Sequence, residues 1–156
     1  MKRLLLMRHA EASRDAPTDL DRPLNERGVA AARSMGVTVA ARGFCPQQLI
    51  SSPAKRAMQT AAVFAESAGL AIEIALDERI YEAIPQTLLG ITNRFSDEFE
   101  TAMIVGHNPG FEGFIALLTG ESQQMRAGAI AVINLKAGYW ADVKSGVGEQ
   151  IEMLHP

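Results

Sequence analysis

The stretch Leu4-Leu5-Leu6-Met7-Arg8-His9-Ala10-Glu11-Ala12 decides how the rest of the chain is interpreted. Its four consecutive apolar residues predict a strand that is buried on both faces, as in a parallel sheet. Arg8 and His9 follow at once, so they would lie at the carboxyl end of this strand. Open α/β folds bind their ligands at that end. The stretch therefore predicts an α/β fold with a basic ligand site beside His9.

A second stretch repeats this pattern. Ala102-Met103-Ile104-Val105-Gly106-His107-Asn108-Pro109-Gly110 is another apolar run that ends at a histidine. The chain has only 3 histidines, so finding two of them directly after predicted strands calls for an explanation. A parallel sheet would bring both strand ends to one edge. We therefore expect His9 and His107 to lie close together.

The remaining segments predict strands and helices that alternate. Asn25 can cap a helix that runs to Gly43, and Ser52 can cap a second helix whose first residue is Pro53. Further helices are expected over residues 86–95 and after Asn108, and strands over residues 4–7, 49–51, 71–76, 102–106 and 129–135, with a closing hairpin of 139–143 and 150–154. This order predicts a three-layer α/β/α sandwich with a mostly parallel central sheet. At 156 residues the chain is expected to form a single domain, 1–156.

Composition excludes several kinds of function. A net charge of −3 gives no general attraction to nucleic acid or to an anionic membrane. No apolar run approaches the ~20 residues of a membrane helix, so we expect a cytoplasmic protein. Cys45 is the only cysteine, and no histidine or basic cluster adjoins it in the sequence, which disfavours a catalytic thiol. The third histidine, His155, lies in the terminal tail, so a metal site would lack a third ligand and none is expected.

Three strand-to-helix junctions are expected to converge at one edge of the sheet. They are Arg8-His9, the segment 51–56 and the segment 106–108. At the second and third junctions a helix begins, and a helix N-terminus favours an anion. Arg56 would lie in the first turn of its helix, where its planar guanidinium can bind two phosphate oxygens. The junctions thus predict a cationic pocket for one phosphoryl group, in which an imidazole nitrogen could act as the nucleophile.

Four motifs resemble those of the histidine phosphatase superfamily, and most closely its compact SixA-type phosphohistidine phosphatases. They are Leu6-Met7-Arg8-His9-Ala10-Glu11-Ala12, Asp21-Arg22-Pro23-Leu24-Asn25-Glu26-Arg27-Gly28, Ser52-Pro53-Ala54-Lys55-Arg56-Ala57-Met58-Gln59-Thr60-Ala61 and Val105-Gly106-His107-Asn108-Pro109-Gly110. All four occur in the order of the family. The resemblance implies a phosphoglycerate mutase-like fold.

The resemblance also implies roles for single residues. His9 would accept the phosphoryl group, while Arg8, Arg56 and His107 would bind it. An asparagine that relatives of the mutase type carry after the first motif is absent, and Ser13 is the nearest polar substitute. Glu82 matches the position of the general acid in larger relatives; weaker candidates for that role are Asp21, Glu11 and Asp77.

The leading hypothesis is a monomeric phosphatase that needs no cofactor and acts on phosphohistidine in a protein, such as a phosphotransfer domain or phosphocarrier. The alternatives are a phosphomonoesterase for small metabolites and a non-catalytic phosphate-binding module. An intact His9 argues against the binding module, which needs no nucleophile. The segments around the pocket are short, so we expect a compact molecule with little lid.

Overall fold

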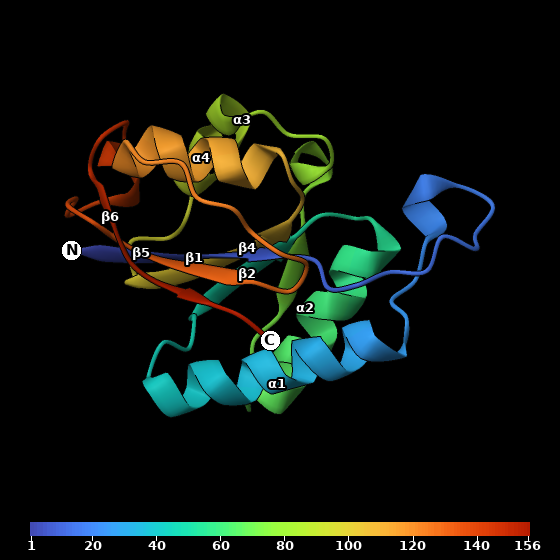
Figure 1. Cartoon of the computed structure of the whole chain (residues 1–156). Coiled ribbons are helices and arrows are strands. Elements are labelled where there is room, and N and C mark those ends of the chain that lie inside the picture. Colours follow the sequence, from blue (N-terminus) through green and yellow to red (C-terminus); the bar gives the residue numbers. More distant parts are fainter.

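The computed structural model describes residues 1–156 and centres on one six-stranded sheet (Figure 1). Its strands are β1 (Lys2–Arg8), β2 (Gln48–Ser51), β3 (Ile74–Leu76), β4 (Thr101–Gly106), β5 (Ile130–Leu135) and β6 (Gly148–Leu154), and their order across the sheet is β3-β2-β4-β1-β5-β6. Neighbours from β3 to β1 pair in parallel, whereas β5 and β6 add two antiparallel pairings. The predicted mostly parallel sheet is confirmed, with β4 and β1 at its centre.

Helices cover both faces of the sheet. α1 (Glu26–Arg42) and α2 (Lys55–Ser67) pack together on one face, and α3 (Pro85–Thr92) and α4 (Gly110–Thr119) pack together on the other (Figure 1). The side chains of β1 alternate between the two cores. Leu5 and Met7 join the core that includes α1 and α2, whereas Leu4 and Leu6 join the core that includes α3 and α4. All four are fully buried, which explains the unbroken apolar run and confirms the three-layer sandwich.

Local signals set the ends of α1 as predicted. The side chain of Asn25 accepts a hydrogen bond from the N–H of Gly28 at 2.8 Å, and Gly43 ends the helix with a left-handed φ of 71°. A Cβ on Gly28 would lie 2.0 Å from the carbonyl oxygen of Glu11. The glycine therefore lets the chain that follows His9 run directly across the start of α1.

The predicted closing hairpin is wrong in its first strand, whereas its predicted second strand, 150–154, lies within β6. Residues 139–143 form a short 3₁₀ turn, Trp140–Asp142, instead of a strand. The reason is Trp140, which is fully buried and anchors this segment in the core. β6 begins at Gly148 and completes the sheet by pairing with β5 alone.

Some predicted boundaries also differ. α2 begins at Lys55 with Ala54 as its N-cap, because the Ser52 side chain contacts His107 instead of capping the helix. The third strand is confined to Ile74–Leu76, and α3 ends at Thr92. These shifts leave the order of the elements unchanged.

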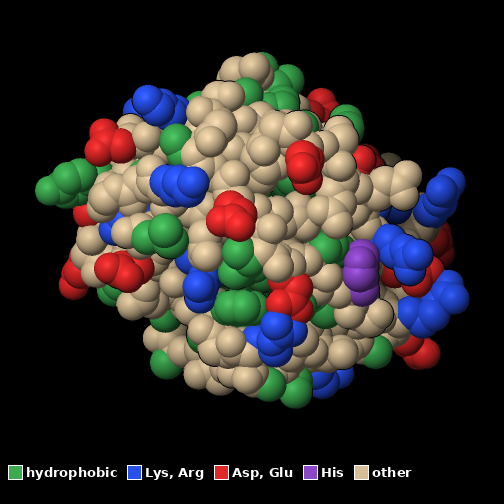
Figure 2. Space-filling model, turned by 60° about the vertical axis from the view of Figure 1, so that its left-hand side comes forward, with side chains coloured by type: hydrophobic (Ala, Val, Ile, Leu, Met, Phe, Trp, Pro, Cys, Tyr) green, Lys and Arg blue, Asp and Glu red, His purple; other side chains and the backbone are tan.

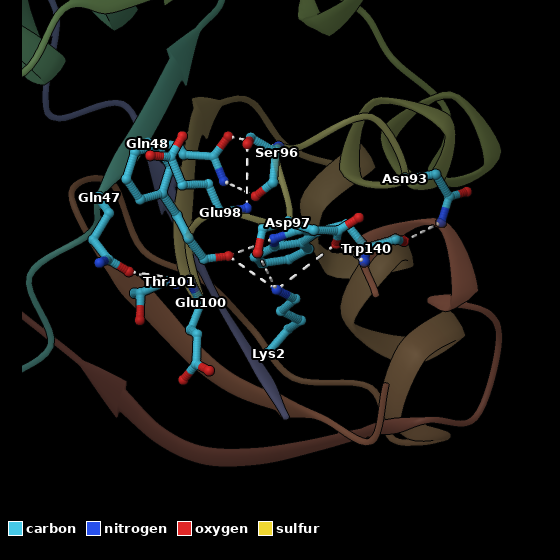
Figure 3. Close-up of polar contacts among 11 residues, drawn as sticks. Lys2, Gln47, Gln48, Asn93, Ser96, Asp97, Glu98, Glu100, Thr101 and Trp140 are labelled. Carbon is cyan, nitrogen blue, oxygen red and sulfur yellow. Dashed lines mark hydrogen bonds and ion pairs between the residues drawn. The ribbon is translucent and has the colours of Figure 1, made fainter. Parts of the chain in front are cut away.

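A partly buried polar cluster holds the amino-terminal end of β1 in place (Figure 3). Lys2 Nζ donates to the carbonyl oxygens of Asp97 and Phe99 at 3.3 and 3.1 Å, and it lies 5.6 Å from the centroid of the Trp140 ring. The Trp140 indole N–H donates to Phe99 at 2.9 Å, and its backbone N–H donates to the Asp97 carboxylate at 2.7 Å. We call these four residues the Lys2 cluster. Its bonds supply the partners without which a buried ammonium would be costly.

Two surface properties bear on partners. On the face in Figure 2, positive and negative side chains are interspersed. No helix has both the length and the apolar character needed to cross a bilayer.

Candidate active site

The carboxyl ends of three neighbouring strands build the site. β2, β4 and β1 are adjacent in the sheet in that order, and Arg8 at the end of β1 pairs with Gly106 at the end of β4. Ser52, His107 and His9 follow these three strands directly. The centroids of the two histidine rings are 5.2 Å apart. The predicted meeting of His9 and His107 is therefore confirmed.

A cavity of about 320 Å³ opens at this edge of the sheet. It brings together five of the side chains predicted for the site, namely Arg8, His9, Arg56, Glu82 and His107. The rest of its lining consists of Asp19, Tyr81 and the segments 83–84 and 108–110. A larger groove of about 680 Å³ runs along β6, but none of its side chains is a histidine or an arginine.

His9 has an unprotonated ring nitrogen in this cavity. Its Nδ1 lies 2.8 Å from the carbonyl oxygen of Ala10, and since a carbonyl can only accept, Nδ1 carries the hydrogen. Nε2 then keeps its lone pair and accepts a hydrogen bond from Arg56 Nε at 3.3 Å. The pKa of His9 is lowered to about 4, chiefly by burial and also by the positive charges of Arg56 and Arg8. The ring is therefore neutral at pH 7, which is the form that can attack phosphorus.

His107 is held in place by Ser52. Its Nε2 lies 2.7 Å from the Ser52 hydroxyl oxygen, and Ser52 has no exposed surface. The same oxygen accepts a hydrogen bond from the N–H of Ala54 at 3.2 Å. Burial is the main cause that lowers the pKa of His107 to about 3, followed by repulsion from His9 in its protonated form and from Arg56. The residue predicted as a helix cap thus serves mainly to orient the second histidine.

Arg56 extends from the first turn of α2, and its side chain is only 7% exposed. Nε donates to His9, Nη1 donates to the carbonyl oxygen of Asp19 at 2.7 Å, and Nη2 donates to the Asp19 carboxylate at 3.1 Å. The plane of the guanidinium is therefore fixed before any ligand binds. Such preorganised donors are the most effective stabilisers of developing charge.

Asp19 is a site residue that sequence reasoning missed. It lies in the 3₁₀ turn Asp19–Asp21, within the loop over the strand ends. Its carboxylate accepts hydrogen bonds from the Tyr81 hydroxyl at 2.5 Å and from Arg22 Nη1 at 3.2 Å, in addition to Arg56. The bond from Tyr81 is the main reason that the pKa of Asp19 is lowered to about 2. No periodicity marks this residue; its only signal is a polar loop beside a strand end.

Arg8 has a buried donor with no partner. Its Nη1 donates to the carbonyl oxygen of Met125 at 2.8 Å, whereas its Nε is buried and makes no hydrogen bond. A buried donor left unpaired costs about 1–3 kcal/mol. Met125 is itself fixed by Glu112, whose carboxylate accepts a hydrogen bond from the Met125 N–H at 2.9 Å. Arg8 also lines the cavity, so its positive charge lies beside the space that a phosphoryl group would fill.

Among the predicted general acids, Glu82 alone lines the cavity. It is exposed, and its φ of 57° makes it the one residue other than glycine with a left-handed backbone. Asp21, Glu11 and Asp77 lie outside the cavity. Glu11 and Asp77 are instead engaged in salt bridges with arginines.

Ser13, predicted to contact phosphate, lies outside the cavity. The Ser13 hydroxyl closes a local turn by accepting a hydrogen bond from the N–H of Asp15 at 3.1 Å. Cys45 is half-buried after α1 and is likewise outside the cavity. No three side chains of His, Cys, Asp or Glu lie close enough together to hold a metal ion.

The fold and the site agree with one class of enzyme. Residues 4–126 match the model of the histidine phosphatase superfamily, branch 1, and the chain belongs to this family. It is accordingly a phosphatase, as its four motifs predict.

Single relatives place the chain near the SixA proteins. The crystal structure of a candidate phosphohistidine phosphatase SixA from Agrobacterium tumefaciens matches with a TM-score of 0.85 at 29% identity, covering 99% of this chain and 98% of that chain. The protein histidine phosphatase SixA in complex with tungstate has the same fold, with a TM-score of 0.81 at 22% identity over 98% of this chain and 96% of that chain. An uncharacterized protein of Mycobacterium tuberculosis is 33% identical over 152 residues, which are 90% of this chain and 93% of the relative.

Proposed function

We propose that this phosphatase removes the phosphoryl group from a histidine of another protein. The observation that carries the proposal is the unprotonated Nε2 of His9, which faces a cavity lined by Arg8, Arg56 and His107. A nucleophile and three potential donors around one small cavity suit attack on a phosphoryl group. A module that only binds phosphate would not need the nucleophile.

The reaction proceeds in two steps. His9 Nε2 attacks phosphorus, a new P–N bond forms, and the P–N bond to the substrate imidazole breaks. The electron pair of the broken bond stays on the substrate nitrogen, which then takes up a proton. Water next attacks the phosphorus of phospho-His9, and inorganic phosphate leaves while Nε2 regains its lone pair. Because the first step exchanges one P–N bond for another, it needs little acid catalysis.

The neighbours of His9 have separate tasks in these steps. Arg8, Arg56 and His107 stabilise the charge on the phosphoryl oxygens. Glu82 transfers protons: it protonates the leaving group when this is an oxygen, and it accepts a proton from the attacking water. Asp19 cannot protonate the leaving group, because its pKa of about 2 keeps it ionised at neutral pH.

A protein is the favoured substrate because little of the chain covers the cavity. The loop 13–23 contributes only Asp19 to the lining, and Ile84 at the rim is 60% exposed. A small ester would gain binding energy from its phosphoryl group alone, which limits kcat/KM. A phosphorylated protein could also contact the exposed rim. The likeness to proteins named as phosphohistidine phosphatases supports the same choice.

The test is to offer the purified protein a phosphohistidine protein, a phosphoserine peptide and a panel of sugar phosphates. We expect kcat/KM to be higher by orders of magnitude for the phosphohistidine protein. Turnover of a sugar phosphate near ~10⁵ M⁻¹s⁻¹ would instead favour a phosphomonoesterase for small metabolites. Binding of phosphate without hydrolysis of any substrate would favour the binding module.

The intermediate gives a second test. During turnover, His9 should carry phosphate that is labile in acid and stable in base, and His9→Ala should abolish hydrolysis while leaving the far-UV circular dichroism unchanged. Phosphate trapped on another residue would contradict the assignment.

We also propose that the enzyme acts as a cytoplasmic monomer without metal, cofactor, membrane or nucleic acid. Activity should therefore be retained in EDTA.

A further inference from the structure

Asp19 places a fixed negative charge at the mouth of a cavity whose other charged walls are largely cationic. We infer that Asp19 determines specificity, because its carboxylate disfavours substrates with a second negative charge next to the phosphoryl group. This inference rests on the proposed phosphatase function of the same cavity. It goes beyond that function by naming what the phosphoryl group must be attached to.

The position of the carboxylate is set from three sides. Oδ2 accepts from the Tyr81 hydroxyl at 2.5 Å and from Arg56 Nη2 at 3.1 Å, while Oδ1 accepts from Arg22 Nη1 at 3.2 Å. The three donors come from different parts of the chain: the loop before α3, the first turn of α2, and the loop before α1. The charge is therefore held at a defined place, even though the Asp19 side chain is 48% exposed.

The side chain of Asp19 is not needed merely to attach its loop to the cavity. The backbone carbonyl of Asp19 already accepts from Arg56 Nη1 at 2.7 Å, and the Arg22 Nε–H donates to the carbonyl oxygen of Ser13 at 3.0 Å. These backbone contacts would remain if the carboxylate were replaced by an amide. What the carboxylate adds is its charge.

That charge acts on a substrate in two ways. It forms a salt bridge with Arg22, so the positive charge of that arginine is partly neutralised and attracts a second anionic group of a substrate less strongly. It also repels such a group directly, and like charges brought together at a binding site are strongly disfavoured. Substrates with a phosphoryl group and a nearby carboxylate or second phosphate are therefore selected against. A phosphorylated imidazole carries no other anion next to its phosphoryl group, so it is not affected.

The experiment compares two small phosphate esters of similar size, phosphoglycolate and 2-hydroxyethyl phosphate. They differ in whether a carboxylate or a neutral hydroxyl lies near the phosphoryl group. Asp19→Asn should raise the ratio of kcat/KM for phosphoglycolate to that for 2-hydroxyethyl phosphate by about tenfold, as expected for one close, partly screened charge pair. Tyr81→Phe, which removes one of the donors that fix the carboxylate, should shift the ratio in the same direction by less.

Asp15→Asn is the matched control, because it removes the same charge from the same loop outside the cavity and should leave the ratio unchanged. A ratio in Asp19→Asn within twofold of the wild-type ratio would overturn the inference, even if both esters are hydrolysed more slowly. The ratio of the Kd values of the two esters is also measured by calorimetry in the His9→Ala background, where binding does not depend on turnover. The two claims can therefore fail separately. An active enzyme with an unchanged ratio would contradict only the role of Asp19. An inactive protein whose Kd ratio still changes in the Asp19→Asn variant would contradict only the proposed phosphatase function.

Discussion

Replacing Arg56 with lysine keeps a positive charge at the cavity but removes the planar fork of the guanidinium. In the native site three nitrogen atoms of Arg56 donate in fixed directions: Nε to His9, Nη1 to the Asp19 carbonyl and Nη2 to the Asp19 carboxylate. The ammonium of lysine is a single point charge. It cannot hold Asp19 with two bonds and also direct a donor to the phosphoryl oxygens.

The expected loss follows from the number of directed bonds. Removing one preorganised donor to a transition state costs about 10²–10³ in rate, which corresponds to about 3–4 kcal/mol of activation free energy. Stability should change less, because Asp19 is half exposed and water can replace the lost partner of its carboxylate. A net hydrogen bond contributes about 1 kcal/mol. Activity and stability should thus respond very differently to Arg56→Lys.

The assay is steady-state hydrolysis of a small chromogenic phosphate ester, with urea unfolding measured in parallel. Arg79→Lys is a matched control, since Arg79 also donates through Nε and Nη2 to a carboxylate, that of Asp77, but lies outside the cavity. The control should retain wild-type kcat. A kcat for Arg56→Lys within threefold of wild type would refute the view that directed donors of Arg56 stabilise the transition state.

Three further predictions concern orientation, pH and stability. Ser52→Ala should lower kcat by about five- to tenfold, because His107 loses one orienting hydrogen bond worth about 1 kcal/mol. Ser51→Ala is the control, since it removes a buried hydroxyl that does not contact His107. An equal loss of kcat in both variants would contradict the orienting role of Ser52. The free energy of unfolding should fall as the pH decreases from about 6.5 to about 4. In this range the histidines of the unfolded chain take up protons, whereas folded His9 and His107, with pKa values of about 4 and about 3, stay neutral, so acid favours the unfolded state. Urea unfolding at a series of pH values should show a smaller slope for His9→Gln, and an unchanged slope would show that His9 is not responsible. Trp140→Ala should destabilise the fold by about 4 kcal/mol in urea unfolding, as is usual for a fully buried tryptophan, while kcat of the folded protein remains near wild type; a loss below about 1 kcal/mol would argue against an anchoring role.

The centre of the fold could be predicted because its signals are local. β1 and β4 are buried on both faces, so their sequences are continuous apolar runs, and each ends where a histidine follows. Parallel pairing then places His9 and His107 at one edge without further information. The cap at Asn25 was equally predictable, since a side-chain acceptor at a helix start acts within its own turn.

The parts that were not predicted depend on contacts between distant segments. Asp19 belongs to the site because Arg56 and Tyr81, 37 and 62 positions further along the chain, donate hydrogen bonds to it. The sequence predicts a hairpin strand over 139–143, yet the buried contacts of Trp140 hold this segment in a 3₁₀ turn. Ser13 is polar and close to His9 in sequence, but its hydroxyl closes a local turn.

The Lys2 cluster and the pair His9 and His107 lie at opposite ends of the strands β1 and β4, about 20 Å apart for a strand of the length of β1. The bonds around Trp140 that secure the fold therefore share no side chain with the cavity. Substitutions and insertions in the loops near His9 can accumulate during evolution without removing this anchor. A fold arranged in this way can acquire new substrate specificity, because the contacts that stabilise it at the far end of the sheet are not altered.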